Sequence, residues 1–283
     1  MMSQSISGIG RKIPVTIITG FLGTGKTTLL RNLLAQANGR RIAIVVNEFG
    51  SLGIDGEILR SCGIENCPDE DIVELTNGCL CCTVADDFIP TMQALIDRPD
   101  PPEHIVIETS GLALPKPLLK AFSWPDIRTR MTVDGVITLV DAPAVAAGRF
   151  ADDPAAVAAQ RAADPSLDHD NPLAEVYEDQ LNAADLIVLN KTDLLEIAET
   201  DAVEAAIIKA VPRKVVTLRA VEGRLDPAVL LGIGAGAEDD LQARPSNHDG
   251  ADDHEHDDFE SFVVVMPEQV GADAVLKRLS DVA

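Results

Sequence analysis

Short, continuous apolar runs alternate with stretches of helical periodicity up to about residue 220. The apolar runs predict strands at residues 13–19, 41–46, 72–75, 104–108, 135–141, 186–190 and 214–218. Helical patterns fall between several of them, at residues 26–37, 86–97, 118–122 and 201–210. Strands that are apolar throughout are buried on both faces, as in parallel sheets. The alternation therefore predicts an α/β fold built on a doubly wound, mostly parallel sheet.

Three stretches depart from this rhythm and suggest how the chain is divided. The Ala- and Asp-rich residues 143–184 indicate an insertion of helix and loop in a first domain that spans residues 1–233. Residues 234–258 are rich in Gly, Ala, Asp, Glu and His, which predicts a solvated acidic linker rather than a core element. Residues 259–283 hold one predicted strand and one predicted helix. Because that is too little to bury a core alone, we interpret them as the start of a small α+β domain.

Composition and charge narrow the class of protein. The chain is 46% hydrophobic and has a formal net charge of −23, which disfavours nucleic acids and anionic membranes as partners. It contains no apolar stretch of about 18 residues and no basic, then apolar, N-terminal signal. The five cysteines all lie between Cys62 and Cys82, a cluster typical of reduced thiols rather than of a secreted disulfide framework. These features predict a cytoplasmic protein with thiols available for metal or redox chemistry.

A phosphate-binding loop is the most specific motif. Residues 20–27 read Gly-Phe-Leu-Gly-Thr-Gly-Lys-Thr, with a predicted strand before them and a predicted helix after them. In such a loop, glycines let main-chain N–H groups wrap the phosphates, and the helix N-terminus adds positive field. Lys26 is expected to reach the β- and γ-phosphates and Thr27 to bind Mg²⁺, so both are candidate catalytic residues. The predicted nucleotide-binding residues of this loop are Gly20, Gly23, Thr24, Gly25, Lys26, Thr27 and Thr28.

A second motif indicates which base is bound. Asn190-Lys191-Thr192-Asp193 directly follows an apolar strand and fits the guanine-reading pattern Asn-Lys-x-Asp. A buried Asp193 carboxylate could accept hydrogen bonds from guanine N1–H and N2–H₂ together, and adenine offers no such pair. Lys191 could lay its stem over the base and Asn190 could fix the loop, although a helix-capping role for the aspartate is the simpler alternative. Residues 219–223, after the next strand, are where a further base-contacting loop is expected.

The segment Glu108-Thr-Ser-Gly111 ends a strand that the fold places beside the phosphate loop. A carboxylate there can hold Mg²⁺ through water or orient the attacking water, which makes Glu108 the third candidate catalytic residue. Gly111 leaves room for a main-chain N–H to meet the γ-phosphate, as nucleotide switches do. An ordinary strand-end carboxylate is the alternative.

Closely spaced thiols suggest a metal site. Cys79, Cys81 and Cys82 lie within four residues at a loop-to-helix junction, where thiolates can converge on Zn²⁺ or Co²⁺. Buried small apolar cysteines are the alternative. Three further groups are weaker candidates: Glu48 as a ligand of Mg²⁺ or of the thiol-bound metal, the pair Cys62 and Cys67 as structural or secondary residues, and His248, His254 and His256 as weak ligands in a plain acidic linker.

With these motifs the chain resembles the CobW family of metallochaperone GTPases, relatives of the urease and hydrogenase maturation GTPases. The matching segments are residues 20–28, 47–50, 79–82, 108–111 and 190–193. Residues 152–172 and 61–67 resemble the cobalamin-biosynthesis branch rather than the zinc-homeostasis branch. The family usually has a fuller C-terminal domain than residues 259–283 supply.

The resemblance implies a GTPase that binds GTP with Mg²⁺ and holds a metal at the Cys-x-Cys-Cys thiolates. In the cobalamin branch that metal is Co²⁺, and hydrolysis releases it to the client, cobaltochelatase. A zinc chaperone or an activator of another metalloenzyme is the alternative. A third possibility is a non-hydrolysing protein that sequesters metal with its His- and Asp-rich tract. The sequence contains no evident arginine finger, so slow intrinsic turnover is expected.

Overall fold

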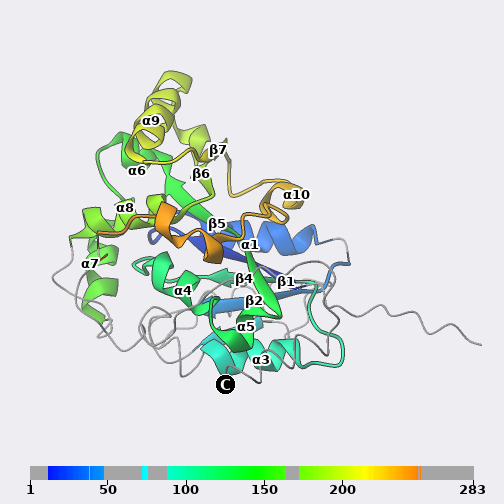
Figure 1. Ribbon diagram of the computed structural model, residues 1–283. Coiled ribbons are helices and arrows are strands. Elements are labelled where there is room, and N and C mark those ends of the chain that lie inside the picture. The colour runs from blue at the N-terminus through cyan, green and yellow to red at the C-terminus, as the bar shows by residue number, and fades with distance from the viewer. Residues whose placement is uncertain are drawn as a thin grey trace, which may run out of the picture. The chain divides into compact units, whose positions relative to one another are not determined.

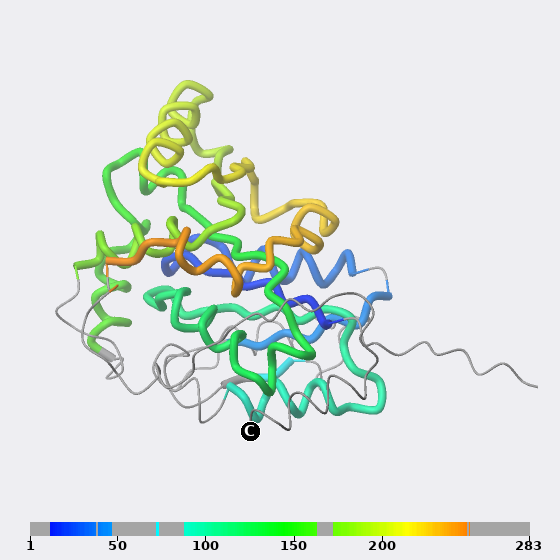
Figure 2. Tube along the Cα trace, viewed as in Figure 1, coloured from blue at the N-terminus to red at the C-terminus, as the bar shows by residue number. Residues whose placement is uncertain are grey.

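The structure is a computed structural model. It describes residues 12–37, 39–47, 72–75, 88–163, 172–247 and 249. Seven strands form one sheet in the order β3-β2-β4-β1-β5-β6-β7, and each neighbouring pair is parallel (Figures 1 and 2). The strands are β1 (Ile13–Thr19), β2 (Ile42–Asn47), β3 (Ile72–Leu75), β4 (His104–Glu108), β5 (Met131–Asp141), β6 (Leu186–Asn190) and β7 (Val216–Arg219). The predicted doubly wound α/β fold is confirmed.

Helices cover both faces of this sheet. They are α1 (Lys26–Ala35), α3 (Ile89–Ile96), α4 (Pro115–Ala121), α5 (Pro125–Arg128), α6 (Ala142–Ala146), α7 (Pro154–Ala163), α8 (Leu173–Ala183), α9 (Ile197–Ala210) and α10 (Pro227–Leu230). Alternate residues of each strand point to opposite faces. On one face, Val15 and Ile17 pack in a core with α3, α4 and α5, and on the other face Ile18 packs with α1 and α10 (Figure 1).

The strands were easier to locate from sequence than the helices. The predicted bounds of β1, β3, β4 and β6 match the structure, whereas β5 begins at Met131 instead of residue 135. Helix α9 begins at Ile197 instead of residue 201, because Glu196 and Glu199 form a capping box that starts the helix a turn earlier. Helix α4 begins at Pro115, whose fixed φ suits the first turn of a helix.

Residues 234–247 are anchored to the core by buried side chains, so the prediction of a solvated linker is wrong for this stretch. Ala237 is fully buried in the core under β5, and the buried Glu238 accepts hydrogen bonds from Thr132 Oγ1 (2.6 Å) and Val133 N–H (2.9 Å). Arg244 is 1% exposed, and its guanidinium donates to Asp185 at 2.7 Å. The composition was misleading because these charged side chains are buried together with their partners.

The stretch 143–184 contains α6, α7 and α8, in keeping with the predicted insertion of helix and loop, although residues 164–171 lie outside the described part. The chain divides into two units after Asp249. The strand and helix predicted within residues 259–283 also lie outside the described residues. Within the described ranges, no helix has both the length and the apolar character needed to cross a bilayer.

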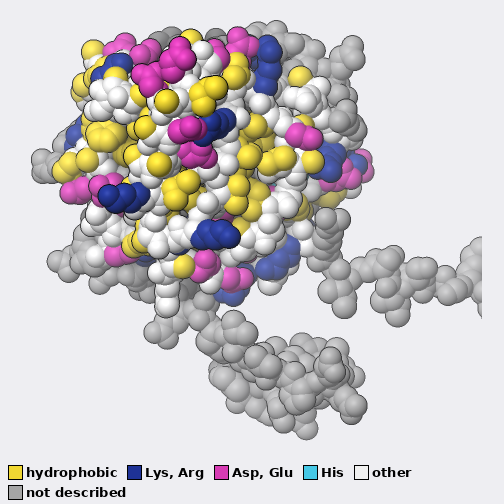
Figure 3. Space-filling view, turned by 90° about the horizontal axis from the view of Figure 1, so that it is seen from above, with side chains coloured by type: hydrophobic (Ala, Val, Ile, Leu, Met, Phe, Trp, Pro, Cys, Tyr) yellow, Lys and Arg dark blue, Asp and Glu magenta, His cyan; other side chains and the backbone are white. Residues whose placement is uncertain are grey.

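Charge is mixed over the surface of the first unit. On the face seen in Figure 3, acidic and basic side chains are interspersed with apolar ones, despite the net charge of −23. Acidic residues near the top edge of that view lie beside basic ones. The excess of negative charge is therefore not gathered into one patch on the described part of this face.

Candidate functional site

The phosphate loop follows β1 at the carboxyl edge of the parallel sheet, where α/β proteins bind their ligands. Its three glycines all have positive φ, of 136° at Gly20, 79° at Gly23 and 99° at Gly25. A Cβ on Gly20 would lie 2.4 Å from the main-chain oxygen of Leu139, and a Cβ on Gly25 would lie 2.4 Å from the Asn190 amide nitrogen. Glycine is therefore required at both positions for steric as well as conformational reasons.

Lys26 is the first residue of α1 and is 8% exposed. Its ammonium nitrogen donates to the main-chain oxygens of Gly20 at 2.7 Å and Phe21 at 3.2 Å. The hydroxyl of Thr24 donates to the same Phe21 oxygen at 2.8 Å. The loop carbonyls thus hold the Lys26 ammonium against the loop. Phosphate oxygens, which are charged, would accept stronger hydrogen bonds from this ammonium than the carbonyl oxygens do.

Asn190 ends β6 and ties two loops together. It is 2% exposed, its amide nitrogen donates to the Thr24 carbonyl at 2.8 Å, and its amide oxygen accepts from Gly223 N–H at 3.0 Å. One buried side chain at the end of β6 therefore joins the phosphate loop to the loop after β7. This placement agrees with the loop-fixing role that the motif predicts for Asn190.

The next two motif residues lie nearer to solvent. Lys191 adopts the left-handed conformation, with φ of 60°, and its ammonium pairs with Asp141 at 2.5 Å. Asp193 lies in a 3₁₀ turn, Thr192–Leu194, and is exposed rather than buried. The sequence-based expectation of a buried Asp193 carboxylate is therefore not met, since the side chain is exposed. The Asp193 carboxylate would become buried only when a guanine base covers it.

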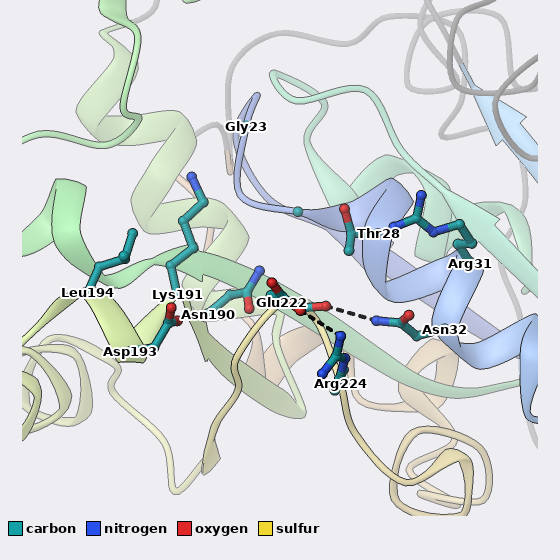
Figure 4. Close-up of a pocket in the computed structure, with 11 residues that line it drawn as sticks. Gly23, Thr28, Arg31, Asn32, Asn190, Lys191, Asp193, Leu194, Glu222 and Arg224 are labelled. Carbon is teal, nitrogen blue, oxygen red and sulfur yellow. Dashed lines mark hydrogen bonds and ion pairs between the residues drawn. The ribbon is translucent and has the colours of Figure 1, made fainter.

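These elements enclose a pocket of about 420 Å³. In Figure 4, the residues after β6 lie on one side of it and the residues of α1 on the other. It is lined by Gly23, Gly25, Thr28, Arg31, Asn32, Asn190, Lys191, Asp193, Leu194, Glu222 and Arg224. Arg31, Asn32, Leu194 and Arg224 were not predicted from the sequence. Asn32 could have been predicted, because it lies one helical turn after Thr28 and therefore on the same face of α1.

The loop after β7 closes the pocket, as its position in the sequence suggested. Asn32 Nδ2 donates to the main-chain oxygen of Glu222 at 2.8 Å, and the Glu222 carboxylate pairs with Arg224 at 2.7 Å (Figure 4). Glu222 and Gly223 both have positive φ, of 51° and 62°. A Cβ on Gly223 would lie 2.9 Å from the main-chain nitrogen of Leu29, so this loop packs closely on α1.

The segment that begins at Glu108 lies beside the phosphate loop. Glu108 is 3% exposed at the end of β4, opposite Ile18 of β1, and Thr109 N–H donates to the Ile18 carbonyl at 2.9 Å. A Cβ on Gly111 would lie 2.8 Å from the main-chain nitrogen of Leu22. The structure thus brings Glu108 and Gly111 to the phosphate loop, as the fold prediction requires.

Mg²⁺ is implied by the fold, and the residues present suit it. The Thr27 hydroxyl, on the first turn of α1, and the Glu108 carboxylate, at the adjacent strand end, are hard oxygen donors of the kind that Mg²⁺ prefers. When bound with a nucleotide, the ion supplies positive charge that neutralises the phosphates.

An aromatic cluster joins the phosphate loop to the insertion. The ring of Phe21 lies 5.9 Å from Phe150 and 6.0 Å from Tyr177, and those two rings are 5.0 Å apart. Burial raises the pKa of the Tyr177 hydroxyl far above its usual value. No motif predicted this contact, because it joins residues from distant parts of the chain.

The remaining metal ligands predicted from the sequence fall in other segments of the chain. Cys79, Cys81, Cys82 and Glu48 lie outside the described residues, and so do Cys62, Cys67, His248, His254 and His256. In the ranges that the structure does describe, no group of three His, Cys, Asp or Glu side chains could hold a metal ion.

Comparisons with known proteins agree with this geometry. The sequence pattern of the family described as CobW/HypB/UreG, nucleotide-binding domain, matches residues 14–218. A protein of Sinorhizobium sp named Zinc chaperone CobW is 54% identical over 275 residues, which are 96% of this chain and 78% of that protein. A protein of the same name from Pseudomonas aeruginosa is 54% identical over 242 residues, 84% of this chain and 64% of that protein.

A solved structure gives a similar result. The crystal structure of Zn(II)-bound YjiA GTPase from E. coli superposes with a TM-score of 0.53 at 25% identity. The match covers 79% of this chain and 62% of that one. The chain thus spans less than two thirds of the Pseudomonas relative and of this crystal structure.

Proposed function

The chain belongs to the CobW/HypB/UreG family and is a P-loop GTPase, and from this premise we propose that it is a metallochaperone that couples GTP hydrolysis to the handling of Zn²⁺. The observation that carries the nucleotide part is the bridge made by Asn190. This side chain holds the phosphate loop at Thr24 and the loop after β7 at Gly223, and so shapes one pocket from three segments.

The proposed roles follow the chemistry of the residues. Lys26 binds the β- and γ-phosphates, Asp193 reads guanine, and Glu108 orients water or holds Mg²⁺ together with Thr27. Gly111 senses the γ-phosphate through its main-chain N–H. In support, β4, β6 and β1, the strand that precedes the Gly20–Thr27 loop, all end at one edge of the parallel sheet.

The metal part of the proposal rests on Cys79, Cys81 and Cys82, whose thiolates suit a tetrahedral borderline metal. Zinc is preferred over cobalt because the Sinorhizobium and Pseudomonas relatives are both named zinc chaperones. Cobalt, with cobaltochelatase as the client, is the alternative that the sequence resemblance suggested. A cytoplasmic location is part of the proposal, since a reducing compartment keeps thiols available.

The test measures Zn²⁺ affinity by chelator competition, with the full chain bound to GDP or to a non-hydrolysable GTP analogue. We expect tighter binding in the GTP-analogue state, by roughly 5- to 150-fold, as is typical of coupled sites. The metal must then strengthen binding of the GTP analogue by the same factor. Equal Zn²⁺ affinities in the two states would refute the coupling. The titration is repeated with Co²⁺. Because thiolate sites generally bind Zn²⁺ more tightly than Co²⁺, the metal whose affinity changes more between the GDP and GTP-analogue states, and not the one bound more tightly, decides between zinc and the cobalt alternative.

A pair of double variants tests the ligands. Cys81→Ala with Cys82→Ala should lose tight Zn²⁺ binding and keep GDP binding. Cys62→Ala with Cys67→Ala removes the same number of thiols from the neighbouring segment and serves as the matched control. If the first double variant still binds Zn²⁺ as tightly as the control does, the metal lies elsewhere.

A further inference from the structure

The turn that carries Gly111 is held by a side chain from the insertion. Gln180, on α8, is 1% exposed, and its amide nitrogen donates to the main-chain oxygens of Gly111 at 3.1 Å and Ala113 at 3.2 Å. One side-chain amide group therefore uses both of its N–H bonds on one turn. Those two carbonyls fix the path of the chain on the carboxyl side of Gly111.

Gln180 is itself anchored to the sheet next to the phosphate loop. Its main-chain oxygen accepts a hydrogen bond from the Thr138 hydroxyl at 2.8 Å. Thr138 lies in β5 directly opposite Thr19, the residue that precedes the phosphate loop. The turn, through Gln180, and the phosphate loop, through Thr19, are thus attached to the sheet at neighbouring positions.

The other side of the turn is equally crowded. The position that a Cβ of Gly111 would take lies 2.8 Å from Leu22 N and 3.2 Å from Gln160 Oε1 of α7. Gly111 is therefore enclosed by the phosphate loop, α7 and α8. Such a peptide can be aimed at a ligand without moving, since its neighbours already define its orientation.

The amide oxygen of Gln180 differs from its amide nitrogen in its contacts. Its amide oxygen is buried and has no hydrogen-bond partner among the described residues. An unsatisfied buried acceptor costs stability, so the favourable contacts of this side-chain amide are those of its N–H groups to the turn. Its amide nitrogen, in contrast, donates both of its N–H groups to the turn.

We propose that Gln180 is a positioning residue for GTP hydrolysis, which orients the Gly111 turn toward the γ-phosphate from the insertion helix α8. The inference rests on the proposed sensing role of Gly111. It predicts that loss of the two N–H bonds affects the γ-phosphate and leaves the binding of GDP, which lacks that phosphate, unchanged.

The experiment uses Gln180→Met in the full chain, a change that conserves volume and removes the donors. Gln242→Met, the same substitution at an exposed position in a 3₁₀ turn, is the matched control. We expect kcat for GTP hydrolysis to fall about tenfold, the effect of losing about one net hydrogen bond in the transition state, while the Kd for GDP stays within about twofold. The Kd for a non-hydrolysable GTP analogue should rise.

A second variant guards against a purely structural effect. Gln180→Glu keeps the length of the side chain, and its protonated carboxyl can still donate one of the two hydrogen bonds. Its deficit in kcat should therefore shrink as pH is lowered, relative to Gln180→Met at the same pH. Unchanged kcat in both variants, or equal losses of affinity for GDP and for the GTP analogue, would overturn the inference.

Gly111→Ala separates this inference from the proposed function. If Gly111→Ala lowers the preference for the GTP analogue over GDP and Gln180→Met does not, only the role of Gln180 is wrong. If neither variant changes that preference, the sensing role of Gly111 is wrong as well. If the unmodified chain hydrolyses no GTP, the proposed function itself fails.

Discussion

Asn190→Ala should loosen the phosphate loop in a way that can be measured by stability and by nucleotide affinity. The substitution removes the hydrogen bonds to the Thr24 carbonyl, at 2.8 Å, and from Gly223 N–H, at 3.0 Å. Both bonds are buried, and each orphaned main-chain group costs about 1–3 kcal/mol if it finds no new partner. The pocket borders Asn190, so water can reach part of the site, and the lower end of that range applies.

We therefore expect the free energy of unfolding to fall by about 2 kcal/mol in total, which lowers Tm by roughly 4–8 °C for a domain of this size. GDP affinity should fall too, because the nucleotide must reorder a loop that is already ordered in the unmodified chain. The part of that loss that comes from reordering the loop is at most about 2 kcal/mol, which is roughly 30-fold in Kd. Thermal unfolding and a fluorescent GDP titration measure the two quantities.

Two further variants show whether the bridge itself is responsible. Asn190→Asp keeps the hydrogen bond from Gly223 N–H but places an oxygen, which cannot donate, against the Thr24 carbonyl. This variant therefore measures the effect of losing the hydrogen bond to the phosphate loop alone. Asn182→Ala, at a half-buried asparagine on α8 whose main-chain oxygen accepts from Arg213, is the matched control. The reasoning is refuted if Asn190→Ala binds GDP within twofold of the control and unfolds within about 2 °C of it, since such small shifts are within the range of ordinary surface changes.

The remaining predictions concern the support of the site. Burial lowers the pKa of His104 to about 4, although the nearby Asp134 carboxylate acts to raise it. The imidazole therefore stays neutral in the folded state at pH values where the unfolded chain, with a pKa of about 6.5, takes up a proton. Unfolding free energy should thus decrease as pH falls from about 6.5 to 4, by up to about 3 kcal/mol, and His104→Gln should remove that part of the slope in denaturant titrations. Phe150→Ala should cost about 2 kcal/mol in the same titration, because the ring is only half-buried, whereas the exposed Val229→Ala should change it by less than about 0.5 kcal/mol. A loss at Phe150 no larger than at Val229 would show that the aromatic cluster does not support the phosphate loop.

The sequence predicts the sheet well because its strands are buried on both faces. A run such as Ile13–Thr19 is apolar or β-branched at nearly every position, and burial on both sides requires that. The start of β5 escaped prediction because Thr132 and Asp134 interrupt the apolar pattern. Asp134 is buried there because its carboxylate accepts N–H bonds from residues 232, 233 and 234, at 2.6, 3.0 and 2.9 Å. A partner a hundred residues away leaves no local signal.

The same limit explains the error over residues 234–247. Their composition is polar, yet Arg244 is buried because Asp185 and the Ala183 carbonyl accept its N–H groups. Whether a charged side chain is solvated or buried depends on the partner it finds in the fold. Composition shows that a residue is charged but not which partner it finds. The predicted end of the first domain, at residue 233, therefore falls before the end of the first unit at Asp249.

The phosphate loop illustrates the difference between recognising a ligand and holding the loop that binds it. The motif at Gly20–Thr27 identifies phosphate chemistry because that chemistry requires particular residues at fixed spacing. The side chains that hold the loop and its neighbouring turn are Asn190 and Gln180, and only the first belongs to a motif. Both are amides, which suit buried main-chain groups because they add hydrogen bonds without adding charge.

Helix α8 extends this support beyond the nucleotide. Next to Gln180, the Asp179 carboxylate accepts from the Ser246 hydroxyl at 2.6 Å and from Asn247 N–H at 2.8 Å. Adjacent residues of one helix thus contact the Gly111 turn and the last described stretch of the chain. Helix α8 thus joins the Gly111 turn to residues 246–247 through hydrogen bonds made by two adjacent side chains. The insertion that interrupts the sheet pattern is therefore part of the frame in which the nucleotide pocket is built.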